Sequence, residues 1–266
     1  MSGIRRLAGV VVAVVLVLLL FSIPAHATSR AGGDWEFEVA PYMWFMAMDG
    51  TVNARGQRAT VHESISDVIE ETDFAAMVHL EARKGIWGLF IDPMYSYFTS
   101  DGSVGHVDVK VKTDWWLVGF GGSYRLTEWR GGTEANQQGF LDVLLGGRYW
   151  SVDNKIHVDI PTMGVVSVKK SADWVDPFIG LRLRTYLTKK CFIDTRGDIG
   201  GANAFGTSSN FTWNALAGVG YHLSKNTALW AGYRAFYVNR DNGHGNSRFK
   251  WNATLHGPLF AVGFRF

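Results

Sequence analysis

Cysteine is nearly absent from this chain, because Cys191 is the single one among 266 residues. One cysteine excludes an internal disulfide framework and any metal centre built from several thiolates. Proline is scarce too, with six residues, and no proline-, serine- or glutamine-rich stretch divides the chain. The sequence therefore predicts one large domain after its N-terminal segment, and not two domains joined by a linker.

Long hydrophobic runs are missing beyond residue 27. No later stretch approaches the roughly 20 residues that span a bilayer without meeting a charge or a glycine. A large excess of either charge is missing as well: lysine and arginine number 26 against 24 aspartate and glutamate residues, and Arg5 and Arg6 account for the difference. This balance predicts no nucleic-acid partner, and any membrane crossing beyond residue 27 has to be made by strands.

Residues 1–27 have the features of a secretory signal peptide. Arg5 and Arg6 precede an apolar run over 7–23, and Pro24 is followed by the small-residue motif 25–27. We expect export, cleavage after Ala27 and a mature domain over 28–266. The alternative is an uncleaved membrane anchor, because the apolar run is close in length to the roughly 20 residues that span a bilayer.

The last strand is the most regular one. Phe260, Val262, Phe264 and Phe266 alternate with small or charged residues, and the chain ends on the last aromatic. Period-two alternation places these four side chains on one face of a strand. A terminal phenylalanine closing such a strand resembles the C-terminal signature of bacterial outer-membrane β-barrels, which the barrel-assembly machinery reads in that family. The alternative is the last strand of a soluble sandwich.

Strand patterns recur along the whole mature chain. We expect strands at 35–47, 73–83, 86–99, 113–126, 139–152, 172–187, 191–203, 211–223, 227–239 and 255–266. Tight turns at 84–85, 188–190 and 224–226 alternate with longer connections at 48–72, 100–112, 153–171, 204–210 and 240–254. Alternating valines and isoleucines at 107–111 and 156–160 indicate strands that continue into two of the long connections. Short connections at one end and long ones at the other are typical of outer-membrane barrels. The prediction is an all-β, closed antiparallel transmembrane barrel of about ten strands, with eight as the alternative.

The two faces of these strands differ in charge. One face carries the set Glu36, Glu38, His79, Glu81, Asp92, Arg125, Asp142, Arg148, Asp176, Arg182, Arg184, Asp194, Arg196, Asp198, Arg234 and Arg265. Every cation in the middle of a strand is arginine, whereas the ten lysines lie at turns, in loops or at loop-side strand ends. Arginine suits enclosed pairing with carboxylates, so we expect this face to line the lumen. The opposite face has aliphatic residues in mid-strand and aromatic residues toward the ends, as a lipid-facing band does.

Several segments carry a resemblance to small bacterial outer-membrane β-barrel proteins of the OmpA/OmpW-like kind, which are largely without assigned function. These segments are Tyr42-Met43-Trp44 through Asp49-Gly50-Thr51-Val52, 66–69, 81–85 with Trp87-Gly88 and Asp92, and 174–177 with 180–182. The resemblance covers most of the mature chain and implies a location in the outer membrane of a Gram-negative bacterium. Its motifs are structural, so they imply a fold and a location more than an activity.

The sequence indicates no enzyme. Outer-membrane proteases of the omptin type share the strand number but need aspartate and Asp-His pairs at the extracellular rim. The nearest candidates are Asp153, His157 and Asp159 in one loop and Asp241 with His244 in another, and solvated loop residues explain them as well. No serine-hydrolase element and no metal-ligand spacing is present. We therefore expect no catalytic residue, no metal and no cofactor.

Two functions follow for a barrel of this kind. The leading hypothesis is a structural or porin-like, small-solute-passage barrel whose charged lumen is either structural or a selective path. Ser64 or Ser66 could cap a helix in the first long loop, with Val68 and Ile69 as a plug over the barrel mouth. The alternative hypothesis is a surface protein that binds lipopolysaccharide or another ligand through its extracellular hairpins. Its phosphate-binding candidates are Lys110, Lys112, Lys155, Lys169 and Lys170.

Overall fold

The computed structural model describes seven segments of the chain: residues 35–54, 57–104, 107–130, 138–160, 164–203, 208–242 and 249–266. The expected signal peptide over 1–27 and its cleavage after Ala27 lie outside these residues, as does His244.

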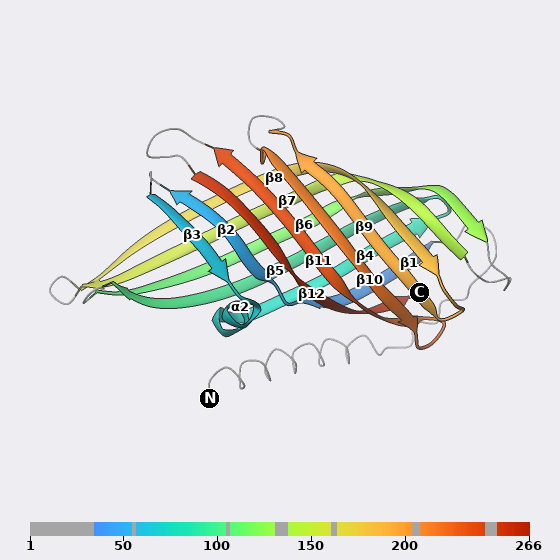
Figure 1. The fold of residues 1–266 in the computed structure, drawn as a ribbon, viewed down its shortest axis with the longest axis horizontal. Helices are drawn as coiled ribbons and strands as arrows, with labels where there is room; N and C mark the ends of the chain where they lie inside the picture. Colours follow the sequence, from blue (N-terminus) through green and yellow to red (C-terminus); the bar gives the residue numbers. More distant parts are fainter. Residues whose placement is uncertain are drawn as a thin grey trace.

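Ten antiparallel strands form a closed barrel (Figure 1). They are β1 (Glu36–Trp44), β4 (Thr72–Lys84), β5 (Trp87–Val104), β6 (Val107–Arg130), β7 (Gln138–Ile160), β8 (Gly164–Tyr186), β9 (Cys191–Gly201), β10 (Phe211–His222), β11 (Thr227–Asn242) and β12 (Phe249–Arg265). Each pairs with its neighbour in this order, and β12 pairs back with β1. The backbone amides of Phe37 and Phe266 complete the closure by donating to each other's carbonyl oxygens at 3.1 and 2.9 Å. The predicted ten-stranded closed barrel is confirmed.

The expected loop over 48–72 is wrong in part. It contains β2 (Ala47–Ala54), β3 (Gln57–Glu63) and α2 (Ile65–Glu71). β2 continues the register of β1 along β12, from Trp44 opposite Leu259 to Ala47 opposite His256. Sequence reasoning ended this strand early because glycine and polar residues from Asp49 onward resemble a loop, whereas pairing with β12 and β3 makes them a strand.

A close backbone approach joins β1, β2 and β12. The Phe45 amide donates to the carbonyl oxygen of Pro258 at 2.9 Å. A Cβ atom at position 257 would overlap the Phe45 carbonyl, so only glycine fits there. The long strand formed by β1 and β2 can therefore stay in register with β12 through this point.

Four strands extend well beyond the barrel at one end. β5 to β8 continue as paired hairpins, with Val104 opposite Val107 and Ile160 opposite Gly164. The predicted continuation of strands into 100–112 and 153–171 is confirmed (Figure 1). We call this the loop end of the barrel, and the opposite end, with the short turns and the C-terminus, the turn end. No helix in the described part of the chain is long and apolar enough to cross a membrane.

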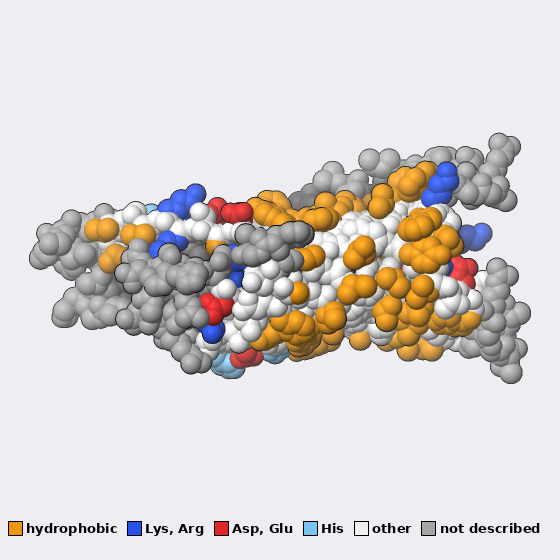
Figure 2. Space-filling model, turned by 90° about the horizontal axis from the view of Figure 1, so that it is seen from above, with side chains coloured by type: hydrophobic (Ala, Val, Ile, Leu, Met, Phe, Trp, Pro, Cys, Tyr) orange, Lys and Arg blue, Asp and Glu red, His pale blue; other side chains and the backbone are white. Residues whose placement is uncertain are grey.

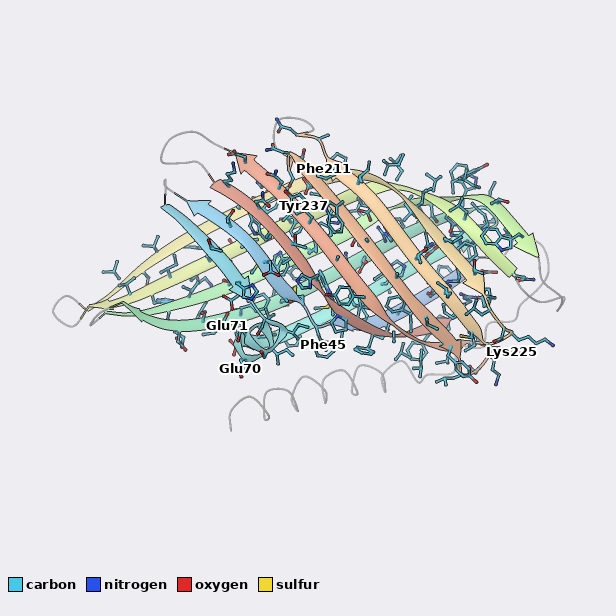
Figure 3. All side chains as sticks on the ribbon, in the orientation of Figure 1. Phe45, Glu70, Glu71, Phe211, Lys225 and Tyr237 are labelled. Atoms are coloured by element: carbon cyan, nitrogen blue, oxygen red, sulfur yellow. The ribbon has the colours of Figure 1, made fainter. Side chains whose placement is uncertain are left out.

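The outer surface of the barrel is apolar. Leu145, Trp87 and Leu89 are 67, 64 and 62% exposed, respectively, although they are large hydrophobic side chains. Figure 2 shows such side chains gathered along the barrel wall, with lysine and arginine toward both ends. Phe211 and Tyr237 lie side by side on this wall toward the loop end, whereas Lys225 lies at the turn end (Figure 3). This arrangement matches a lipid-facing band between two polar ends.

Candidate functional site

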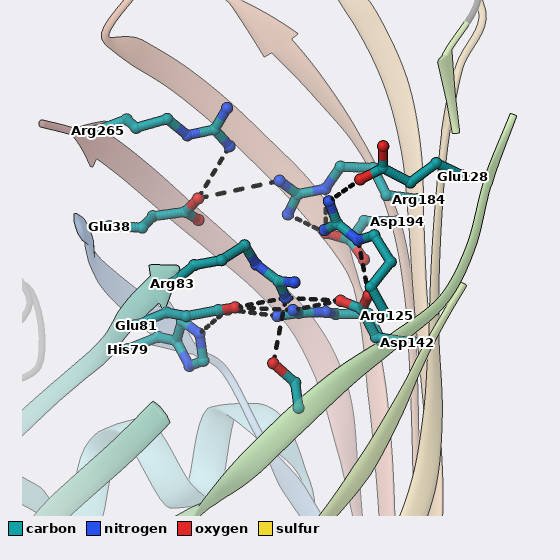
Figure 4. A network of polar contacts seen from close by, with 12 residues as sticks. Glu38, His79, Glu81, Arg83, Arg125, Glu128, Asp142, Arg184, Asp194 and Arg265 are labelled. Atoms are coloured by element: carbon teal, nitrogen blue, oxygen red, sulfur yellow. Dashed lines mark hydrogen bonds and ion pairs between the residues drawn. The ribbon is translucent and has the colours of Figure 1, made fainter. Parts of the chain in front are cut away.

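The interior of the turn-end half is a network of ion pairs (Figure 4). Asp142, with none of its surface exposed, accepts hydrogen bonds from Arg83 and Arg182 at 2.8 Å and from Arg125 at 3.0 Å. Glu81 pairs with Arg182 and, at 3.0 Å, with Arg83. Three guanidinium groups therefore share two carboxylates, and each carboxylate holds strands that are distant in the sequence.

A second part of this network lies nearer the turn end. Glu38 pairs with Arg265 at 3.0 Å and with Arg184 at 3.9 Å, and Arg184 also pairs with Asp194. Because Glu38 is on β1, Arg265 on β12 and Arg184 on β8, these pairs cross the lumen as well as the seam where the barrel closes (Figure 4).

A layer of mixed contacts lies above the network. Arg148 is 2% exposed and pairs with Asp198 at 2.8 Å. Its guanidinium stands 4.4 Å from the ring centre of Phe236 and 4.9 Å from that of Phe178. Asp176 accepts from the indole of Trp174 at 3.1 Å and from the hydroxyl of Ser209 at 2.9 Å. Each of these buried polar groups is therefore held by a hydrogen bond or an ion pair.

The charged face predicted from the sequence points inward. On the interior lie Glu38, His79, Glu81, Asp92, Arg125, Asp142, Arg148, Asp176, Arg182, Arg184, Asp194, Arg196, Asp198, Arg234 and Arg265. Glu36, the remaining member, is exposed at the turn end, where it lines a cavity.

The loop-end half of the interior is filled by aromatic residues that sequence reasoning missed. Trp150 has none of its surface exposed, and its ring lies 5.4 Å from Trp174, 6.1 Å from Trp115 and 5.5 Å from Trp251. Phe236 packs on the same indole at 5.2 Å. We call these five residues the aromatic seal. Strand parity could have revealed it, because Trp150 shares a face with Arg148, Trp174 with Asp176 and Phe236 with Arg234.

Helix α2 packs against the buried apolar cluster through Val68. Ser64 caps the helix, and its side chain and backbone amide lower the pKa of Asp67 by hydrogen bonding to the carboxylate. Val68 packs against the buried cluster that includes the seal, and Glu71 accepts from Ser100 at 2.7 Å. The predicted helix is confirmed. Ile69 is half-buried, and a plugging role for Val68 and Ile69 stays a prediction.

Three lysines line up on the outward face of the loop-end extension. Lys112 lies opposite Lys155, and Lys155 opposite Lys169, on the neighbouring strands β6, β7 and β8. We call them the lysine row. Directly opposed residues share a face of the sheet, so the three ammonium groups stand side by side. Among the described residues, none makes an ion pair with a member of this row, whereas the next lysine, Lys110, pairs with Asp101 at 3.2 Å.

Among the described residues, the rim candidates Asp153, His157 and Asp159 do not form an Asp-His pair. His157 bonds to the Ser167 hydroxyl at 2.7 Å, and Asp241 pairs with Lys250 at 3.4 Å. Asp153 lies opposite Asp114 and Ser171. The backbone of Asp159 lies opposite Asp108 and Val165. None of these contacts joins an aspartate to a histidine.

An Asp-His set does occur on the outer wall at the loop end. Asp49 on β2 bonds to Nε2 of His256 at 2.9 Å and also contacts His62, while Nδ1 of His256 bonds to the Tyr233 hydroxyl at 2.7 Å. Both nitrogens of His256 are therefore occupied, and neither is free to activate a water molecule in this arrangement. Sequence reasoning missed this cluster, because only strand pairing brings residues about 200 positions apart together.

No protein-family model and no curated protein matches the sequence. Among solved structures, the outer-membrane protease OmpT of Escherichia coli covers 90% of this chain and 100% of its own, at 8% identity and a TM-score of 0.50. The match to the attachment invasion locus protein Ail of Yersinia pestis, in complex with the heparin analogue sucrose octasulfate, covers 88% of this chain and 99% of Ail. The identity is 13% and the TM-score 0.36. The match to Neisserial surface protein A covers 88% of this chain and 99% of that protein, at 15% identity and a TM-score of 0.29. At these identities the likeness concerns the fold, and the chain is a transmembrane β-barrel of the bacterial outer-membrane type.

Proposed function

We propose that this protein is a barrel of the outer membrane, closed at its loop end, that binds the phosphate groups of lipopolysaccharide at the lysine row. The single observation that carries the proposal is the alignment of Lys112, Lys155 and Lys169 on one face. Like charges directly opposite each other destabilise a sheet. Three such residues in line, without an ion pair among the described residues, are suited to an anion with several charges.

The height of the lysine row above the lipid-facing band fits the position of the lipopolysaccharide phosphates. Trp116, 44% exposed, and Tyr149, 37% exposed, belong to the aromatic residues of the outer wall. Lys112 lies four residues before Trp116 on β6, about 13 Å along the strand toward the loop end. With strands tilted by about 40°, this corresponds to roughly 10 Å above the aromatic residues. We therefore place the row among the phosphorylated sugars that stand above the acyl chains of the outer leaflet.

The interior favours a barrel that is closed at its loop end over the porin-like one expected from the sequence. The aromatic seal occupies the loop-end half, and the charges below it are nearly all engaged in pairs. Interiors of barrels of about eight strands are narrow enough for side chains to fill. We accordingly propose that binding occurs on the outer surface and that the protein has no catalytic role.

Assembly through the last strand belongs to the same proposal. Phe260 is 52% exposed on the outer wall, and β12 closes the barrel by pairing with β1. An apolar strand that closes the barrel against β1 is suited to recognition by the barrel-assembly machinery, with Phe260, Val262, Phe264 and Phe266 as the signal.

Replacing Lys112, Lys155 and Lys169 together with serine is expected to weaken binding of lipopolysaccharide about 100-fold. Each lysine near an anionic membrane surface contributes roughly 1 kcal/mol, and three give about 3 kcal/mol. The measurement is titration of purified lipopolysaccharide into the folded protein in neutral detergent, at low salt and at high salt, because screening should reduce the difference.

The matched control replaces Lys189, Lys190 and Lys225 with serine, which removes the same charge from the turn end. This control should bind lipopolysaccharide as the intact protein does. Equal losses in the two triple variants would show a general charge effect and would contradict a site at the lysine row.

A further inference from the structure

The turn-end half of the barrel contains a cavity of about 150 Å³. Its lining comes from β1, β4, β5 and β8 to β12, so it lies in the lumen and not on the wall. Leu259 lines it and also belongs to the buried apolar cluster that contains the aromatic seal. The cavity therefore ends at the apolar cluster on the loop side.

One side of the cavity is apolar. Leu216, Trp230 and Ala261, from β10, β11 and β12, line it and pack against the buried apolar cluster. The other side is charged: it carries five arginines, Arg234 among them, and the three carboxylates Glu38, Asp92 and Asp194, so cations are in excess. Such a site is matched by a small molecule with an apolar body and one charged group.

Arg234 differs from the other arginines of the lumen. It is 9% exposed, lines the cavity, and donates from Nε to the side-chain oxygen of Asn214 at 2.9 Å. Its guanidinium stands 4.8 Å from the ring centre of Trp44. It makes no direct ion pair with a carboxylate of the described residues, whereas Arg182, Arg184 and Arg265 each have one. Its nearest opposite charge in the cavity is that of Asp92, which is bonded to the Tyr42 hydroxyl at 2.7 Å. A buried guanidinium of this kind leaves room for an anion brought by a ligand.

One of the two turn-end cavities that adjoin this cavity is positively charged, whereas the other has glutamates in its lining. A second cavity of about 650 Å³ at the turn end shares His222, Lys225 and Arg265 with the first. Lys189 and Lys190 line it as well, and none of its lining side chains is a carboxylate. A mouth of one charge sign raises the local concentration of ligands of the opposite sign.

We propose that the lumen binds a small amphipathic monoanion that enters from the periplasm, with its carboxylate on Arg234 and its apolar part on Leu216 and Trp230. The volume sets the size class, because an apolar cavity of about 150 Å³ accommodates a benzene ring. Benzoate and short-chain fatty acids belong to this class. The site is separate from the lysine row, so either proposal can fail without the other.

The test is calorimetric titration of sodium benzoate, with neutral benzyl alcohol as the comparison, into the folded protein in neutral detergent. Benzoate is expected to bind at least tenfold more tightly than benzyl alcohol, because a charge-assisted hydrogen bond is roughly twice as strong as a neutral one. Arg234→Gln keeps a hydrogen-bond donor for Asn214 and removes the charge. This variant is expected to bind benzoate about tenfold more weakly than the intact protein does, and benzyl alcohol with nearly the same affinity.

Two further variants keep the result decisive. Leu216→Trp fills the cavity while leaving every charge in place, so it should abolish benzoate binding even if Arg234→Gln does not fold. Lys84→Gln removes a cation from the same end outside the cavity lining and should bind as the intact protein does. No benzoate binding to the intact protein, equal affinity for the alcohol, or undiminished binding in Leu216→Trp would each overturn the proposal.

Discussion

Replacing Asp142 with alanine is expected to lower the free energy of unfolding by about 3–5 kcal/mol, the cost of leaving buried charges without their partner. The carboxylate is fully buried and joins Arg83, Arg125 and Arg182 on β4, β6 and β8. Without this carboxylate the three guanidinium groups repel one another, and only Arg182 and Arg83 still have an ion pair with Glu81. The measurement is reversible urea unfolding of the protein in lipid vesicles, followed by tryptophan fluorescence.

Glu128→Ala is the matched control. Glu128 also pairs with Arg125, but its side chain is 63% exposed, and exposed pairs contribute about 0–1 kcal/mol. Asp142→Asn keeps the shape and loses the charge, so its unfolding free energy should lie much closer to that of Asp142→Ala than to that of the intact protein. A loss below 1 kcal/mol for Asp142→Ala would show that water reaches these arginines and that the lumen is open at this level.

The intact protein is expected to show no discrete conductance steps in a planar bilayer, and a Trp150→Ala, Trp174→Ala double variant is expected to show them. The two indoles stack at 5.4 Å in the middle of the aromatic seal. Removing both takes away two of the four buried tryptophans of the aromatic seal between the turn-end cavities and the loop end. The variant's folding is checked by circular dichroism before insertion, because each large-to-small change costs about 3–5 kcal/mol.

Helix α2 provides the comparison that separates two kinds of closure. Exchanging 65–71 for a glycine-serine linker of equal length removes Val68 from the buried cluster but leaves the seal intact. We expect this linker variant to show no conductance steps. Steps in the linker variant would make α2 the plug, and steps in the intact protein would restore the porin-like function.

Most of the barrel was predictable because its signals are local. Alternation of side chains along single strands, as at 260–266, and tight polar turns such as 188–190 are set by the geometry of one strand or one hairpin. The same parity groups the arginines and carboxylates on one face, and the use of arginine instead of lysine predicts that this face is the inner one. The helix after Ser64 follows from a capping pattern within four residues. The ten barrel strands, the extended hairpins and the charged interior therefore required no knowledge of distant contacts.

The candidate sites depended on pairing between strands, which no single segment specifies. Lys112, Lys155 and Lys169 were visible as loop-end lysines, but only the register of β6, β7 and β8 makes them a row. The aromatic seal, the Asp49–His256 contact and the Arg234 cavity likewise join residues from different strands. Parity tells which face a side chain takes, whereas the shear of the closed barrel decides which strands' residues meet at one height. For this protein, location in an outer membrane follows from the chain's own pattern, and what the barrel can bind follows only from its closure.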